Sequence, residues 1–177
     1  MTIRPATPDD HDAIWAVLEP IIRAGDTLTN PRDSTREAAL AYWLTPGHDV
    51  FVAEEDGAVV GSYFVRRNYP GAGAHVANAA YATSPAARGR GIARAMCAHS
   101  LDHARSLGCR AMQYNIVIST NERAVRLWQA MGFVIVGRLP GVFAHPQLGD
   151  VDAFVMHRTL GPRIIHQTVS PPVDRES

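Results

Sequence analysis

Lysine is absent from this 177-residue sequence, and all seventeen of its strongly basic residues are arginine. This absence excludes a Schiff-base lysine, a phosphate-loop lysine and any other catalytic lysine. Cysteine is also scarce, since only Cys97 and Cys109 are present. Two cysteines form neither a disulfide scaffold nor a four-cysteine zinc site, so we expect no structural metal.

An excess of charge of either sign is missing as well. The seventeen arginines balance seventeen Asp and Glu residues, and the pI is about 7.1. A neutral chain gives no support for nucleic-acid binding or for a role at a membrane surface. We therefore expect neither a nucleic-acid partner nor a membrane partner.

The sequence also lacks long apolar runs. The first residues, Met1–Pro5, lack the apolar core of a signal peptide. The longest stretch without an acid or an arginine runs from Asn68 to Ala87, and proline and glycine interrupt it. We therefore expect a soluble protein in a reducing, cytoplasmic setting.

The length of the chain fits one compact domain, because a chain of about this size buries close to 70% of its unfolded surface. We expect that domain over residues 1–160. Residues 161–177 contain three prolines and little periodicity, which indicates a loose tail or arm. Ile164 and Ile165 in this tail could pack on a partner.

Hydrophobic periodicity and capping residues predict an alternation of strands and helices. Helices are expected from Thr7 onward and over Ser34–Leu44, Gly91–Leu107 and Thr120–Met131. Strands are expected over Thr2–Arg4, Asp49–Glu54, Val59–Arg66, Val76–Thr83, Ala111–Ile118, Phe133–Arg138 and Asp152–Thr159. Asp56-Gly57 predicts a tight hairpin turn between the second and third strands. The order β-α-α-β-β-β-α-β-α-β-β describes an α+β single domain.

The segment Arg88–Ala93 has the features of an anion cradle. It follows a strand and a proline turn, and it opens a long amphipathic helix. Gly89 and Gly91 allow the backbone to approach a ligand, and the first helical turn presents unpaired N–H groups. A tight turn with two solvated arginines is the alternative. A dinucleotide fingerprint fits poorly, because Arg94 stands where its third glycine belongs.

Two segments together resemble the GCN5-related N-acetyltransferase (GNAT) family. Family members have an Arg/Gln-x-x-Gly-x-Gly/Ala motif, which Arg88, Gly91 and Ala93 match. A second motif lies about thirty residues downstream, and the residues that match it are Asn121, Ala124, Leu127, Gly132 and Phe133. The resemblance covers roughly Thr2 to Leu160. It implies a mixed sheet of six or seven strands, splayed in the middle, with about four helices.

The resemblance implies acetyl-CoA as the cosubstrate. Its pyrophosphate would bind the amides and side chains of the cradle, which are Arg88, Gly89, Arg90, Gly91, Ile92 and Ala93. Its pantetheine would lie along the strand that ends at Ala82 and Thr83. Asn121 would reach the pantetheine from the next helix, although Asn is also an ordinary N-cap residue.

Trp128 departs from the family pattern. Many members have a tyrosine there that protonates the departing CoA thiolate, and an indole N–H is a donor but not a usable acid. The thiolate would then be protonated by water, by Tyr81 or by Tyr114, or it would need no protein acid. Trp128 would then be an aromatic residue of the core or of the cofactor-site rim.

Asn78 and Asn115 are predicted to lie on neighbouring strands, where Asn is disfavoured. A buried amide bonded to backbone is the ordinary explanation. Together with Asn121 and Trp128, however, they resemble the fungal acetyltransferases that act on L-azetidine-2-carboxylate, a proline analogue. That resemblance implies an amide floor for a small substrate, and we expect Asn78, Asn115 and Tyr81 at the catalytic end.

Other candidate residues have weaker local support. His99 and His103 are four residues apart on one helix, but no third metal ligand has a suitable spacing, so a solvated helix edge is expected. Cys97 falls on the apolar stripe of that helix and is expected in the core. Possible bases without a distinguishing context are His75, His145, Asp150 and Asp152.

These observations favour an N-acetyltransferase that holds acetyl-CoA between splayed strands. The free amine of a small molecule would attack the thioester directly, with a water relay as base and a backbone N–H near Tyr81–Thr83 at the oxyanion. The amine is expected to belong to an amino acid or proline analogue, and a homodimer is possible. The alternatives are a non-catalytic CoA or acyl-CoA sensor and an acetyltransferase for peptides or polyamines.

Overall fold

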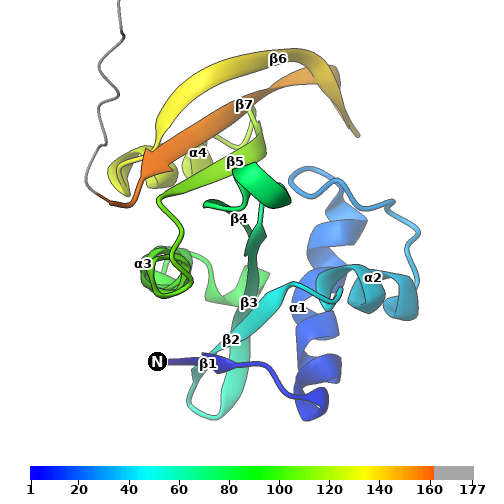
Figure 1. Ribbon diagram of the computed structural model, residues 1–177. Coiled ribbons are helices and arrows are strands. Elements are labelled where there is room, and N and C mark those ends of the chain that lie inside the picture. Colours follow the sequence, from blue (N-terminus) through cyan, green and yellow to red (C-terminus); the bar gives the residue numbers. More distant parts are fainter. Residues whose placement is uncertain (162–177) are drawn as a thin grey trace, which may run out of the picture.

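A computed structural model describes residues 1–161 of the chain (Figure 1). The seven strands are β1 (Thr2–Pro5), β2 (Asp49–Glu55), β3 (Ala58–Arg67), β4 (Val76–Thr83), β5 (Ala111–Ile118), β6 (Val134–His145) and β7 (Gly149–Thr159). The four α-helices are α1 (His11–Ala24), α2 (Arg36–Trp43), α3 (Ile92–Ser106) and α4 (Glu122–Ala130). Their order is the predicted one. The expected tail, including Ile164 and Ile165, lies outside the described residues after Gly161.

All seven strands form one mixed sheet in the order β1-β2-β3-β4-β5-β7-β6. Only β4 and β5 are parallel, and they pair over just two positions, Val76 with Ala111 and Ala77 with Met112. Beyond Ala77 the two strands diverge, so the sheet is splayed in the middle. The predicted α+β fold, with a splayed mixed sheet and four helices, is therefore confirmed.

Two hydrophobic cores cover the two faces of the sheet. On one face, α1 and α2 contribute a core that includes Ile14, Leu18 and Trp43. On the other face, α3 and the segment that follows α4 contribute a core that includes Met96 and Phe133. Each of these large apolar side chains stabilises the fold by about 1.5–3 kcal/mol on burial.

The last hairpin is longer than the sequence predicts. Strand β6 continues to His145 instead of ending at Arg138, although Pro140 and Gly141 suggest a break. The register between β6 and β7 shifts between Leu139 and Phe143, and Gly141 adopts a positive φ of 57° there. This irregularity accommodates both residues without ending the strand.

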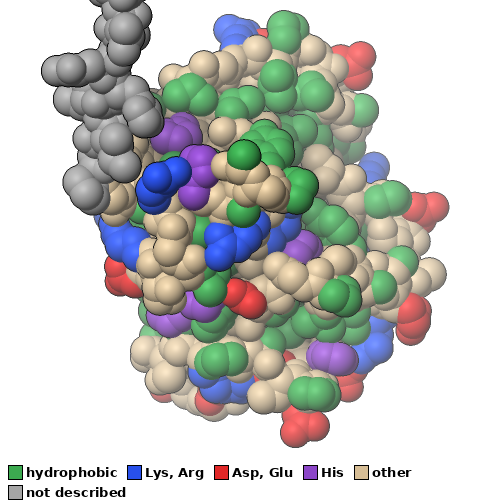
Figure 2. All heavy atoms as spheres, viewed as in Figure 1, with side chains coloured by type: hydrophobic (Ala, Val, Ile, Leu, Met, Phe, Trp, Pro, Cys, Tyr) green, Lys and Arg blue, Asp and Glu red, His purple; other side chains and the backbone are tan. Residues whose placement is uncertain are grey.

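The surface shows no large field of one charge on the face drawn in Figure 2, where acidic and basic side chains are interspersed. Hydrophobic side chains gather over the region of β6 and β7, and the exposed ones include Val134 and Val136. Within residues 1–161, no helix is both long and apolar enough to cross a membrane.

Candidate active site

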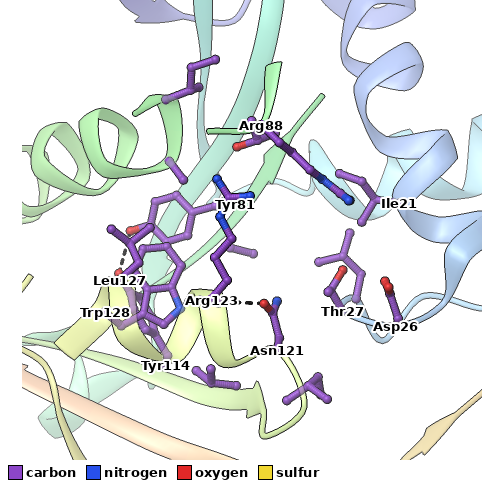
Figure 3. A pocket seen from close by; sticks show the side chains of 18 of the residues that line it. Ile21, Asp26, Thr27, Tyr81, Arg88, Tyr114, Asn121, Arg123, Leu127 and Trp128 are labelled. Atoms are coloured by element: carbon purple, nitrogen blue, oxygen red, sulfur yellow. Dashed lines mark hydrogen bonds between the residues drawn. The ribbon is translucent and has the colours of Figure 1, made fainter. Parts of the chain in front are cut away.

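A cleft of about 570 Å³ opens where β4 and β5 diverge. The segment before α3 and the start of α4 form two of its walls, and the segment after α1 forms another (Figure 3). The residue types expected at a cofactor site therefore come together here. A cleft of this volume falls in the range typical of ligand sites.

The backbone before α3 has the geometry of an anion cradle. Gly89 and Gly91 have φ values of 89° and 82°, and both line the cleft. Gly91 is the N-cap of α3, and a Cβ at Gly91 would meet no atom within 4 Å. The N–H groups of Ile92 and Ala93 lie in the first helical turn, where they have no intrahelical acceptor. The cradle is therefore open and rich in donors, as the sequence predicts.

The arginines around the cradle differ from the expected set. Arg88 lines the cleft, but Arg90 does not, and it pairs with Glu55 at 2.5 Å. Arg94 and Arg123 line the cleft instead, and sequence analysis missed both of them. Arg94 lies one residue beyond the motif, and Arg123 lies two residues after Asn121. Their closeness in sequence to the motif residues could have identified both as residues of the cleft. The positive charge of the cleft comes from three elements.

The backbone of β4 offers free groups to the cleft at alternate residues. The Ser84 N–H donates to the Val60 carbonyl on β3, and residues two positions apart in a strand face the same neighbour. The Ala82 backbone therefore faces β3, and its side chain is buried beneath α1. The Tyr81 and Thr83 backbone groups face the cleft. The Ala82 backbone groups are thus not free for a ligand in the cleft, as its predicted role requires, whereas those of Thr83 are.

Asn121 combines the two roles considered for it. Its Oδ1 accepts from the Ala124 N–H at 3.2 Å, so it caps α4. Asn121 also lines the cleft opposite the cradle (Figure 3). Because the cap occupies the oxygen, the amide nitrogen is the group that remains for a ligand.

Three aromatic residues form one wall of the cleft, and they are Trp128, Tyr81 and Tyr114 (Figure 3). The Trp128 ring lies 5.0 Å from that of Tyr81 and 5.1 Å from that of Tyr114. The Tyr81 hydroxyl bonds to Ser100 at 2.6 Å and to Tyr114 at 2.9 Å. Burial raises the pKa of both tyrosines well above 10. The geometry thus favours a wall over a proton-transfer role for the Tyr81 side chain.

A second cavity of about 160 Å³ lies beside the cleft. The two share lining residues from three elements, including Thr27, Ala80 and Ile116. A cavity of about 150 Å³ accepts a benzene-sized molecule. The second cavity therefore has room for one compact molecule next to the cleft.

Asparagine side chains form a hydrogen-bonded cluster at the second cavity. The Asn78 Nδ2 donates to the Asn68 Oδ1 at 3.1 Å, and the Asn115 Nδ2 donates to the same oxygen at 2.7 Å. The Asn68 Nδ2 donates in return to the Asn115 Oδ1 at 3.1 Å. The structure thus brings Asn78 and Asn115 together through a third asparagine that sequence analysis missed. Asn68 follows β3 directly, and no local pattern distinguishes it.

Arg66 gives the second cavity a positive charge. Its side chain lines the cavity together with Asn78 and Asn115. Its only hydrogen bond within residues 1–161 goes to the Arg67 carbonyl at 3.3 Å, and it forms no ion pair there. Arginine binds carboxylates through its fork of N–H groups. The cavity can therefore hold an anionic group.

Comparisons with known proteins agree with this geometry. The sequence model described as "Acetyltransferase (GNAT) family" matches residues 15–133. The chain belongs to the GNAT acetyltransferase family. This confirms the predicted family and the classification as an N-acetyltransferase.

Several proteins are similar to this acetyltransferase. A GCN5-related N-acetyltransferase from Kribbella flavida is 42% identical with a TM-score of 0.85, and the match covers 89% of this chain and 96% of that one. L-methionine sulfoximine/L-methionine sulfone acetyltransferase from Salmonella typhimurium is 30% identical over 80% of this chain and 85% of its own length. N-acetyltransferase aca1 from Schizosaccharomyces pombe is 30% identical over 63% of this chain, but only 54% of that relative is covered.

A further solved structure shares the fold at lower identity. It is an acetyltransferase from Salmonella typhimurium with its cofactor acetyl-CoA, 24% identical with a TM-score of 0.80, and the match covers 99% of each chain.

Two further ionisable residues line the cofactor cleft of this acetyltransferase. Asp26 lies in the segment after α1, and His145 lies at the end of β6. His145 is among the possible bases that the sequence suggests, but Asp26 is not, because nothing local relates its segment to the cradle. His75, Asp150 and Asp152 line neither cavity. Asp152 instead bonds to the Gly141 N–H at 2.8 Å within the last hairpin.

The two histidines of α3 were expected on a solvated helix edge, and this expectation is wrong. His99 bonds to the Tyr63 hydroxyl, and His103 bonds to Asp49 at 2.8 Å. Both rings therefore attach α3 to the sheet. Cys97 is fully buried in the core. No group of three or more metal-binding side chains occurs in the described part of the chain.

Proposed function

We propose that this chain transfers the acetyl group of acetyl-CoA directly to the amine of a small carboxylate-bearing molecule, such as an amino acid or proline analogue. The observation that carries the proposal is the second cavity, which joins the cofactor cleft and is lined by Arg66 and asparagine side chains. A carboxylate on Arg66 would place the rest of a compact substrate toward the thioester.

The cradle and its arginines suit the phosphates of acetyl-CoA. We assign the pyrophosphate to the amides of residues 89–93 and to Arg88, and we assign the pantetheine to the Tyr81 and Thr83 backbone and the Asn121 amide. The solved relative from Salmonella typhimurium holds acetyl-CoA on the same fold, which supports this assignment. When bound, acetyl-CoA supplies the thioester that the amine attacks.

The asparagine cluster would orient the amine. The Asn78 Oδ1 has no donor among the described residues, so it is available to accept a substrate N–H. Holding the amine near the thioester carbon converts an encounter into a local reaction, which contributes much of the rate in such transfers. The oxyanion of the tetrahedral intermediate would accept a hydrogen bond from a β4 backbone N–H.

The named activities of relatives favour the same substrate class. The relatives include an L-methionine sulfoximine/L-methionine sulfone acetyltransferase and an L-amino acid N-acyltransferase. A polyamine site would need several carboxylates, and within residues 1–161 the two cavities contain one, Asp26. The proposal therefore favours amino acids over polycationic amines.

Release of free thiol from acetyl-CoA tests the proposal. The panel should contain L-azetidine-2-carboxylate, proline analogues, polar and apolar amino acids, polyamines and N-terminal peptides. We expect turnover of a small amino acid, and we expect Asn78→Ala to lose it while still binding CoA.

Turnover of only peptides or polyamines would refute the substrate class while leaving the acetyltransferase reaction in place. CoA binding without thiol release across the panel would favour the sensor alternative, which Trp128 allows because it lacks the acidic hydroxyl of tyrosine.

A further inference from the structure

Asp26 occupies a distinctive place in the cofactor cleft. It directly follows Gly25, which ends α1 with a left-handed φ of 68° and therefore turns the chain toward the sheet. Asp26 is half-buried and lines the cleft together with Thr27. In Figure 3 both side chains lie across the cavity from the Trp128 wall.

The charges that surround Asp26 are mostly positive. Within residues 1–161, Asp26 is the one carboxylate in the lining of either cavity. Arg66 lies in the adjoining cavity. The other charged or titratable groups of the cleft come from α3 and its cradle, from α4 and from strands β4, β5 and β6, and they are Arg88, Arg94, Arg123, Tyr81, Tyr114 and His145. Despite these cations, Asp26 lines the cleft without forming an ion pair with any described residue.

Three other titratable groups of the cleft already have hydrogen-bond partners. The His145 Nδ1 accepts the Gln147 backbone N–H at 3.2 Å. The Tyr81 and Tyr114 hydroxyls bond to each other inside the protein, and burial keeps both protonated. Asp26, by contrast, has no hydrogen-bond or ion-pair partner within residues 1–161, and it is the carboxylate of the cleft.

We propose that Asp26 binds the substrate ammonium and accepts a proton from it. This inference rests on the proposed function and names a proton acceptor that is neither the water relay nor one of the four possible bases that the sequence suggested. The Asp26 carboxylate would take one ammonium proton, and the freed nitrogen lone pair would form the N–C bond to the thioester carbonyl carbon.

The remaining steps release the CoA thiol and the acetylated amine. When the tetrahedral intermediate collapses, the C–S bond breaks and the sulfur leaves as thiolate. The second nitrogen proton goes to that sulfur to give the CoA thiol. Asp26 returns the first proton to solvent. With Arg66 in the adjoining cavity, the site would then bind both ends of a zwitterion, the ammonium at Asp26 and the carboxylate at Arg66.

The pH dependence of kcat/KM in Asp26→Asn tests this role. The assay should use the full chain, acetyl-CoA and whichever amine the wild-type protein acetylates best. At about pH 7 we expect kcat/KM to fall roughly 100-fold or more, the usual contribution of a positioned base. The deficit should shrink at higher pH, because the fraction of free amine rises about tenfold for each pH unit below its pKa. Asp26→Glu should keep part of the wild-type profile.

Asp33→Asn is the matched control, because Asp33 lies in the same segment, is exposed and lines neither cavity. It should leave kcat/KM and the pH profile unchanged. The CoA dissociation constant and the melting temperature of each variant show whether the site is intact. If Asp26→Asn does not fold, Asp26→Ser provides a second variant without the carboxylate.

A kcat/KM for Asp26→Asn within about threefold of wild type at pH 7 would overturn the inference. A loss of equal size at every pH, together with weaker CoA binding, would also overturn it and assign Asp26 to cofactor binding. If the wild-type protein binds CoA but acetylates no amine, both the proposed function and the proton-acceptor role of Asp26 are wrong. If the wild type is active and Asp26→Asn is equally active, only the role of Asp26 is wrong.

Discussion

Asn68 holds the asparagine cluster together at the scale of single residues. Its Oδ1 accepts from both Asn78 and Asn115, and its Nδ2 donates to Asn115. All three side chains are at least half-buried, where an amide without partners costs about 1–3 kcal/mol. The position of Asn78, which we expect to contact the substrate amine, therefore depends on Asn68.

Asn68→Ala should lower kcat/KM for the amine by up to about 100-fold, because small misplacements near a reacting group have effects of this size. Acetyl-CoA should bind with unchanged affinity, since Asn68 lines neither the cradle nor the cleft. Steady-state kinetics and CoA titration measure the two effects. Asn68→Asp keeps the acceptor oxygen and should lose less. Equal loss of CoA affinity and of turnover would contradict this account.

The arginines next to the cradle differ in what they contact, and this difference can be tested at the scale of one element. Arg88 lines the cleft before α3, whereas Arg90 pairs with Glu55 on β2. The first of these arginines is available to phosphate oxygens, and the second already has a carboxylate partner.

Arg88→Ala should raise the dissociation constant of CoA at least about tenfold, since a charge-assisted hydrogen bond contributes about 1.5–3 kcal/mol. Arg90→Ala is the matched control and should change that constant by less than about threefold, because Arg90 pairs with Glu55 and does not line the cleft. Calorimetric titration with CoA measures both variants. A larger effect from Arg90→Ala would restore the role that the sequence motif suggests for it.

The elements differ in how well the sequence predicts them. The bounds of β4 and β5 were predicted to the residue, because Pro85 and Gly108 mark the ends of neighbouring segments. The end of β6 was missed, because a register shift with β7 accommodates Pro140 and Gly141. Such a shift depends on the partner strand, so local sequence does not reveal it.

The candidate site shows the same division. The cradle is a local motif, and its glycines and first-turn amides lie where the sequence predicted. Asp26, Arg66 and Asn68 were missed, because each reaches the site through a turn or strand packed against distant elements. Ala82 was misassigned for a simpler reason, since strand alternation turns its backbone toward β3.

At the scale of the whole molecule, the fold joins two cavities of different character. The cleft opens at the splay between β4 and β5, and the segment after α1 contributes to both cavities through Thr27. One cavity combines a donor-rich cradle with three arginines, and the other combines Arg66 with the asparagine cluster. This arrangement suits a phosphate-bearing cosubstrate beside a small zwitterion. The possible homodimer stays a prediction.

A comparison of two amines that differ only in a carboxylate tests this account most directly. The wild-type protein and Arg66→Gln should each be assayed by thiol release with L-azetidine-2-carboxylate and with azetidine, at one acetyl-CoA concentration. We predict that the wild type strongly prefers the amino acid and that Arg66→Gln loses most of this preference, on the order of 100-fold, while CoA binding is unchanged. Equal turnover of both amines by the wild type, or an unchanged preference in Arg66→Gln, would contradict the account.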